Sequence, residues 1–200
     1  MRKMAWLAIA SCWVILGAMG CGGGDGPAIS GPIALVTDKD RLLTMADDIW
    51  PGIQEGSGFV TGSGTTGGLR MVSFVNFMDP GSVQFRLAAH VMELPVDTRP
   101  EEVQGVIEKL MREGMAMSDW HATRDGTETF SLGGAPTDFE RYAVVAAGAD
   151  EGLVDMEMYV LTRAGDDQKA VLTITGHVNS FDRPTSLKNL DAFLAATPGA

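Results

Sequence analysis

The chain has 200 residues, which is the length of one ordinary domain. Its hydrophobic content of 45% is that of a globular protein and excludes a chain that is disordered throughout. A formal net charge of −11 argues against the basic surface that nucleic-acid binding needs, so no nucleic-acid partner is expected. Two cysteines are too few for a disulfide framework.

Residues 1–20 have the organisation of a secretory signal peptide. Arg2 and Lys3 precede an apolar stretch over residues 4–19, and small residues lead from it to Cys21. The stretch is shorter than the ~20 apolar residues of a typical membrane-spanning helix. We therefore predict a signal peptide that is removed on export; the alternative is an uncleaved signal anchor.

The junction Ala18-Met19-Gly20-Cys21 resembles the lipobox of bacterial lipoproteins. The resemblance implies that Cys21 receives the lipid and becomes the first residue of the mature chain. Residues 21–32 would then be the lipidated cysteine and a Gly/Pro tether, and residues 33–200 a single domain. Ile9-Ala10-Ser11-Cys12 is a second lipobox-like match, but processing there would leave an apolar region too short for export.

The lipoprotein resemblance also implies a location in the cell envelope. Gly22, rather than aspartate, follows the cysteine. In a cell with two membranes this pattern implies an outer-membrane anchor that faces the periplasm. In a cell with one membrane, the domain would sit on the outer face of that membrane.

The first elements of the domain follow its hydrophobic periodicity. A helix is predicted from Thr37 to Ile49, with a cap formed by Thr37 and Asp40. Residues 52–68 are rich in glycine and predict an irregular connection with a short strand over 59–61. A strand buried on both faces over 69–78 and a half-buried strand over 83–92 then form a hairpin.

The helix over 99–113 has the most complete set of signals. Thr98 and Glu101 predict a capping box, and Gly114 ends the helix. One apolar stripe runs along it, made of Val103, Val106, Ile107, Leu110 and Met111.

Strands dominate the rest of the chain. Asp125-Gly126 predicts a tight hairpin turn between strands over 118–124 and 127–132. Further strands are predicted over 139–147, 154–163 and 169–178, with a turn at 165–168, and a last helix over 186–196. This order predicts an α+β fold: a single, largely antiparallel sheet of about six to seven strands with helices packed on it.

The element order resembles the PsbP-like family of extrinsic lumenal and periplasmic proteins. The closest stretch is Lys169 to Ala196, where a Leu-Thr-Ile-Thr-Gly strand leads through Phe181-Asp182 into the last helix. The resemblance spans residues 69–196 and implies a PsbP-like sandwich. It also implies an accessory or assembly role rather than a reaction.

Few residues have the spacing of a metal-binding or nucleotide-binding motif. Met115, Met117 and His121 are candidate ligands for Cu(I), which thioethers and imidazole suit, with Met156 and Met158 as a second Met-x-Met. Methionines are equally ordinary core residues, so no metal or other cofactor is predicted. Residues 62–67 match the dinucleotide fingerprint only in letters, because a strand follows them where the fingerprint needs a helix.

The sequence therefore predicts a membrane-anchored lipoprotein that is not an enzyme. It would bind an envelope protein partner or support an envelope assembly. The alternative is a periplasmic module that binds a small molecule or copper. A large apolar pocket with convergent polar groups would favour the alternative, and a flat surface with one apolar patch would favour the first interpretation.

Overall fold

The computed structural model describes residues 34–56, 58–66, 69–77, 85–114, 119–148, 152–177 and 183–199. They form an eight-stranded antiparallel sheet and three helices, which confirms the predicted α+β class. The predicted number of six to seven strands was too low, because a strand over 34–36 was not predicted and a seven-residue strand over 60–66 lies where an irregular connection was expected. The proposed signal peptide and Cys21 lie outside the described residues.

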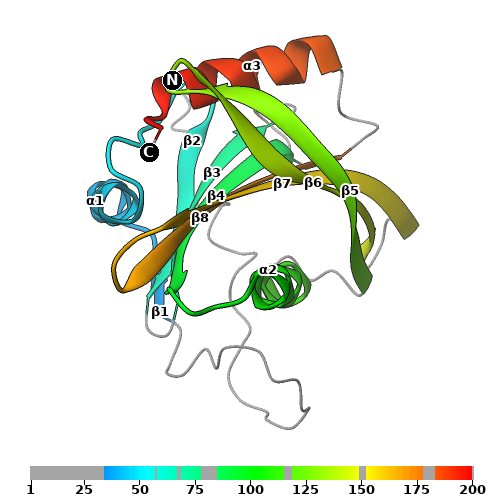
Figure 1. Ribbon diagram of the computed structural model, residues 1–200, viewed down its shortest axis with the longest axis horizontal. Coiled ribbons are helices and arrows are strands. Elements are labelled where there is room, and N and C mark those ends of the chain that lie inside the picture. The colour runs from blue at the N-terminus through cyan, green and yellow to red at the C-terminus, as the bar shows by residue number, and fades with distance from the viewer. Residues whose placement is uncertain are drawn as a thin grey trace, which may run out of the picture.

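The strands form one continuous sheet in the order β1-β2-β3-β4-β8-β7-β6-β5. In chain order the elements are β1 Ala34–Val36, α1 Lys39–Ile49, β2 Val60–Thr66, β3 Arg70–Phe77, β4 Phe85–Pro95, α2 Pro100–Gly114, β5 Asp119–Leu132, β6 Ala135–Gly148, β7 Gly152–Ala164, β8 Gln168–His177 and α3 Arg183–Ala196. Figure 1 shows α2 on one side of the curved sheet and α3 on the other, with α1 beside the β2–β4 end.

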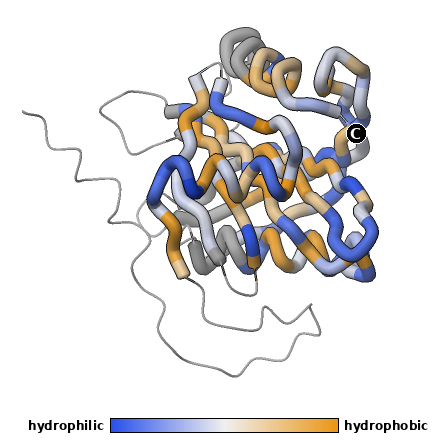
Figure 2. Tube along the Cα trace, turned by 90° about the vertical axis from the view of Figure 1, so that its left-hand side faces the viewer, coloured by the Kyte–Doolittle hydropathy of each residue, from blue (hydrophilic) through white to orange (hydrophobic). Residues whose placement is uncertain are grey.

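Each face of the sheet has its own hydrophobic core. The core on one face joins α1 and α3 to alternate strand positions such as Phe74, Phe139 and Ile174. The core on the other face joins α2 to the intervening positions, such as Met71 and Met158. Figure 2 shows hydrophobic residues along strands and helices alike, and the central strands β4 and β8 are buried on both faces over residues 87–92 and 171–176.

The central strand β4 is buried on both faces, although the sequence predicted that one face would be exposed. Residues 87–92 are all buried, whereas alternation had predicted a half-buried strand. The prediction was wrong because Ala88, His90 and Met92, which resemble a mildly polar outer face, lie beneath α2. The hairpin pairing of β3 with β4 is confirmed. The predicted turn at 79–82 lies outside the described residues.

β2 corrects the prediction of an irregular connection over 52–68. Gly64 lies in this strand directly under α1, and a Cβ there would come within 2.6 Å of Leu42 and 2.7 Å of Met45. The glycine therefore permits close packing of the helix on the strand. The letters that match a nucleotide fingerprint are, over residues 62–66, part of a sheet.

β5 corrects the predicted hairpin at Asp125-Gly126. The strand runs without interruption past these residues, which form a bulge where the pairing with β6 shifts between Arg124 and Gly126. Gly126 has φ +114°, a conformation that favours glycine. The turn itself comes later, at Gly133-Gly134, where both residues have positive φ.

The N-caps of α1 and α2 lie one residue later than predicted, and α3 begins at Arg183, three residues before the predicted start. Asp38 caps α1, and its carboxylate accepts a hydrogen bond from the Arg41 backbone N–H at 2.9 Å. At α2, the Glu102 carboxylate accepts from the Arg99 backbone N–H at 2.7 Å, so Arg99 and Glu102 replace the predicted Thr98 and Glu101. Pro100 is then the first helical residue, where its missing N–H costs nothing.

Candidate functional site

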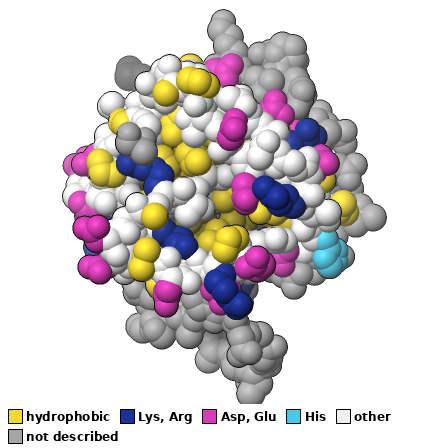
Figure 3. Space-filling model, in the orientation of Figure 1, with side chains coloured by type: hydrophobic (Ala, Val, Ile, Leu, Met, Phe, Trp, Pro, Cys, Tyr) yellow, Lys and Arg dark blue, Asp and Glu magenta, His cyan; other side chains and the backbone are white. Residues whose placement is uncertain are grey.

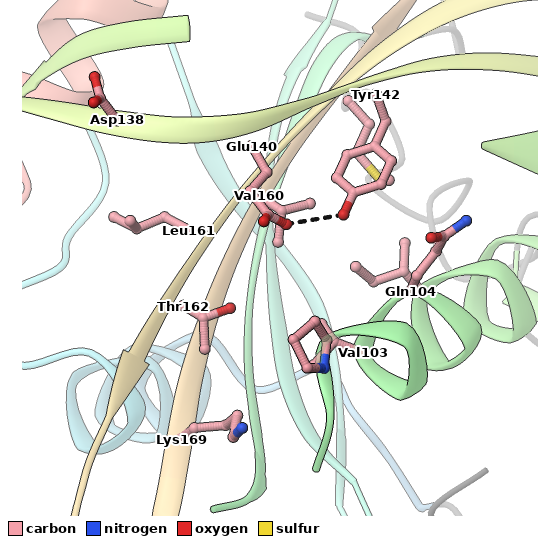
Figure 4. Close-up of a pocket in the computed structure, with 12 residues that line it drawn as sticks. Val103, Gln104, Asp138, Glu140, Tyr142, Val160, Leu161, Thr162 and Lys169 are labelled. Atoms are coloured by element: carbon pink, nitrogen blue, oxygen red, sulfur yellow. Dashed lines mark hydrogen bonds between the residues drawn. The ribbon is translucent and has the colours of Figure 1, made fainter. Parts of the chain in front are cut away.

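A cleft of about 290 Å³ lies between α2 and strands β6, β7 and β8. We call it the α2 cleft, and it is lined by Pro100, Val103, Gln104 and Ile107 of α2, Asp138, Glu140 and Tyr142 of β6, Met158, Val160, Leu161 and Thr162 of β7, and Lys169 of β8. Figure 4 shows Val103 and Gln104 on the helix opposite Glu140, Tyr142 and Val160 on the strands. The volume is close to the lower limit of typical small-molecule sites, ~300 Å³.

The register of the sheet explains the apolar floor of the cleft. Val160 lies opposite Glu140, and Met158 lies opposite Tyr142. Residues directly opposite each other share a face, so these four side chains form a block on the α2 side. Val103, one turn before Ile107 on the helix, covers the block from above.

Glu140 is one of two acidic residues in the cleft wall, and two neighbours hold its carboxylate. The Tyr142 hydroxyl donates to Oε2 at 2.9 Å, and Arg124 lies 3.3 Å from Oε1. The hydrogen bond between Tyr142 and Glu140 is drawn in Figure 4. Because Arg124 comes from the edge strand β5, the carboxylate is fixed in place across two strands.

Burial, followed by the hydrogen bond to Glu140, raises the pKa of Tyr142 to about 12. Both causes disfavour the phenolate, since one removes water and the other places a negative charge beside it. Tyr142 therefore remains a neutral hydrogen-bond donor at every physiological pH.

Polar side chains close the two ends of the cleft. The Gln104 side-chain amide donates to the Ala122 carbonyl of β5 at 3.0 Å and to Glu108 Oε1 at 3.1 Å. At the other end the Lys169 ammonium donates to the Thr98 carbonyl, which ties β8 to the segment before α2. Both contacts hold α2 at its distance from the sheet.

The cleft is apolar within and charged around its mouth. Figure 3 shows hydrophobic side chains exposed near the centre of this face, with acidic and basic side chains around them. Asp138 and Glu140 provide two carboxylates, and the lysine that lines the cleft already donates to a backbone carbonyl. This arrangement suits an amphiphilic molecule whose polar end is a cation or a hydrogen-bond donor.

Four polar side chains are buried under α2 beside the cleft floor. They are Ser73, His90, Thr173 and Thr175, which we call the buried polar patch, and each is at most 6% exposed. Ser73 Oγ and His90 Nδ1 are hydrogen-bonded at 2.9 Å. Burial alone lowers the pKa of His90 to about 4.

A hydrogen-bonded serine and histidine are also the elements of a nucleophile and its base. Ser73 is 3% exposed and His90 6%, so a substrate could not approach the hydroxyl in this conformation. Three other polar atoms of the patch, His90 Nε2 and the two threonine hydroxyls, find no hydrogen-bond partner within the described part of the chain. Leaving a buried polar group unpaired costs about 1–3 kcal/mol.

A second hollow of about 360 Å³ lies between the end of α1 and the β7–β8 turn. Three of its charged groups, Asp48, Glu93 and Arg163, already have partners close by. Arg70 bridges Asp48 and Glu93 at 3.0 Å each, and the Arg163 guanidinium lies 4.6 Å from the centre of the Trp50 ring. With little apolar lining and paired charges, this hollow is a weaker candidate site than the α2 cleft.

Of the candidate copper ligands, the structure describes His121, Met156 and Met158. Met115 and Met117 lie outside the described residues, and His121 is exposed on β5. Met156 and Met158 are buried in the core under α2, as the core interpretation predicted. Within the described ranges, no group of three His, Cys, Asp or Glu side chains is placed to hold a metal ion.

The residues that define the cleft were not singled out from the sequence. A signal was present in the strand over 139–147, where Glu140, Tyr142 and Val144 share one face. An acid at an inward position of an otherwise apolar face marks a buried polar interaction. No comparable signal marks Gln104, whose role depends on the position of β5.

Comparisons with known proteins were made on sequence and on structure. No family model and no curated protein matches the sequence. Among solved structures, the chain is similar to the solution structure of cyanobacterial PsbP (CyanoP) from Synechocystis sp. PCC 6803, with 15% identity and a TM-score of 0.35. The match covers 90% of this chain and 98% of that one, and it concerns fold alone.

Among the described residues, no helix combines the length and the apolar character needed to cross a membrane.

Proposed function

We propose that the chain is an exported, lipid-anchored binding protein whose domain takes a small amphiphilic molecule in the α2 cleft. The single observation that carries the proposal is the cleft itself: an apolar floor of Val160 and Met158 beside a carboxylate, Glu140, held by two partners. An apolar chamber with a few fixed polar groups is the usual form of a small-molecule site. The proposal makes the protein a binding module rather than an enzyme.

The polar end of the ligand follows from the charges at the mouth of the cleft. Asp138 and Glu140 lie together on the β6 wall, where Arg124 balances one of the two negative charges and Lys169 lies at the other end of the cleft, so this wall attracts a cationic head group. Tyr142 adds a neutral hydroxyl at the same wall. We therefore propose an amine or another hydrogen-bond donor on a short apolar body as the class of ligand.

A matched pair of probes tests this proposal. Octylammonium is expected to raise the melting temperature of the full chain more than octanoate does, because a ligand that binds only the folded state stabilises it by mass action. In the Glu140→Gln variant, which keeps the shape of the side chain and loses the charge, the difference between the probes should shrink. Thermal unfolding over a range of probe concentrations measures both effects.

Asp40→Asn serves as the matched control, because Asp40 is an exposed carboxylate on α1, on the opposite face of the sheet. It should leave the preference for octylammonium intact. Equal protection by the two probes, or an equal loss of preference in both variants, would contradict a site at Glu140.

The location of the protein is a separate proposal that rests on the N-terminal residues. A signal peptide over 1–20 and a lipid on Cys21 would attach the domain to a membrane through a tether over residues 22–32. The accessory role and the envelope protein partner implied by the PsbP-like resemblance remain predictions.

Cys21→Ser is expected to release the protein from the membrane fraction or to leave an unprocessed precursor. The reason is that the thiol of Cys21 would carry the lipid, and serine offers no thiol. Cys12→Ser is the control and should leave processing and membrane retention unchanged. Fractionation of cells followed by mass measurement of the N-terminal peptide distinguishes these outcomes, and retention of a processed Cys21→Ser chain would overturn the lipoprotein proposal.

A further inference from the structure

We propose that the buried polar patch binds internal water, in a hydration site directly beside the floor of the α2 cleft. The register places the members of the patch side by side. Ser73 on β3 lies opposite His90 on β4, and His90 lies opposite Thr173 on β8. Thr175 follows two residues after Thr173, so its side chain lies on the same face of the sheet.

The hydrogen-bond inventory of the patch requires a further partner. His90 Nδ1 is bonded to Ser73, but His90 Nε2 and the hydroxyls of Thr173 and Thr175 find none among the described residues. Thr173 is 0% and Thr175 1% exposed, so bulk solvent does not reach them. Buried polar groups in native proteins are bonded to protein or to ordered water, which leaves internal water as the partner.

The chemistry of the patch favours water over an ion. Its members are two threonines, one serine and one imidazole that burial keeps neutral, so no charge is present to balance a bound ion. Water both donates and accepts hydrogen bonds. It can therefore satisfy His90 Nε2 in either tautomer together with hydroxyls that can play either role.

The proposed water site does not depend on the proposed function, because it would be present even if the cleft bound no ligand. Val160 lies opposite Thr173, and Met158 lies opposite Thr175, on the neighbouring strand β7. Both residues also line the α2 cleft. The same two side chains thus separate the proposed water from the cleft.

Relaxation dispersion of ¹⁷O water, measured on the purified full chain, counts the water molecules held longer than the protein takes to tumble. The Thr173→Val, Thr175→Val double variant keeps the shape of both side chains and removes both hydroxyls. We expect this variant to hold at least one long-lived water fewer than the unchanged protein. The same count in the folded double variant would overturn the proposal.

Two further measurements keep the result interpretable. Thr123→Val with Thr127→Val changes two exposed threonines of β5 and should leave the count unchanged. If the double variant does not fold, nuclear Overhauser effects between water and the His90 ring or the Thr173 side chain decide in the unchanged protein. Their presence supports the site, and their absence overturns it.

Discussion

Replacing Ile107 with alanine is expected to lower the free energy of unfolding by about 2–5 kcal/mol, the range for removing a buried aliphatic side chain and leaving a cavity. Ile107 is 1% exposed and belongs to the core under α2. It also lines the α2 cleft, so the cavity would open beside the proposed ligand site. Denaturant midpoints, compared at equal slope, measure the loss.

Lys109→Ala, in the same helix, is the matched control. Lys109 is exposed, and substitutions at such positions usually change stability by no more than about 0.5 kcal/mol. Alanine favours helix at both positions, so helix propensity does not explain a difference between the variants. If the two variants are equally destabilised, Ile107 does not face the sheet and the assigned packing of α2 is wrong. Leu110 and Met111 of the predicted stripe have side chains outside the described residues.

Acid is expected to destabilise the domain by about 3 kcal/mol between pH 6.5 and pH 4 through His90 alone. Burial lowers the pKa of His90 from 6.5 to about 4 in the folded state. Between these values the unfolded chain binds the proton and the folded chain does not, so protons favour unfolding. The contribution of His90 is complete above pH 6.5 and is lost as the pH falls towards 4. The free energy of unfolding, measured in urea at intervals across this range, gives the slope.

His90→Gln separates this effect from other acidic transitions. Glutamine does not titrate, so stability of the variant should vary much less over the same interval, whatever its value at pH 7. The carboxyl groups of Glu55 and Glu102 have lowered pKa values, chiefly through Lys39 and Arg99 respectively. Their contributions are present above the ordinary value of 4.5 and are lost below it. Parallel curves for the two proteins between pH 6.5 and 5 would show that His90 is not buried as a neutral group.

Much of the secondary structure could be predicted from local pattern. The helix over 99–113 and the strands over 139–147, 154–163 and 169–178 lie within a few residues of α2, β6, β7 and β8. In each of them, local propensity, turn residues and hydrophobic period agree. The predicted turn at 165–168 is closed by a hydrogen bond from the Gly165 backbone N–H to the Gln168 carbonyl at 2.8 Å. The α+β class follows from their order alone.

The bulge in β5 shows why the rest could not be predicted locally. Asp125-Gly126 has the letters of a hairpin turn, but the chain continues. The extra residue moves even-numbered side chains to the other face, so Trp120 packs under α2 while Phe130 and Leu132 join the core of α1 and α3. This change of face depends on the position of β5 at the sheet edge, where α2 covers one face and α3 the other. Neighbouring residues in the sequence do not reveal it.

The candidate site could not be predicted from local sequence pattern either. None of Glu140, Tyr142, Ser73 and His90 was singled out by spacing, because each acquires its role from a neighbour on another strand. Ser73 meets His90 only through the register of β3 with β4. Glu140 is held by Arg124 only because β5 lies beside β6 after the bulge.

By itself, the sequence determined the local elements and the fold class, because the hydrophobic periods of helices and strands are visible in neighbouring residues of the chain. The tertiary structure alone decided that both faces of the sheet are covered. That coverage turns His90 from an expected outer face into a member of the buried polar patch. It also places α2 against Glu140 and Tyr142 to form a cleft. Burial is a property of what packs on a residue, and the elements that pack here come from distant parts of the chain.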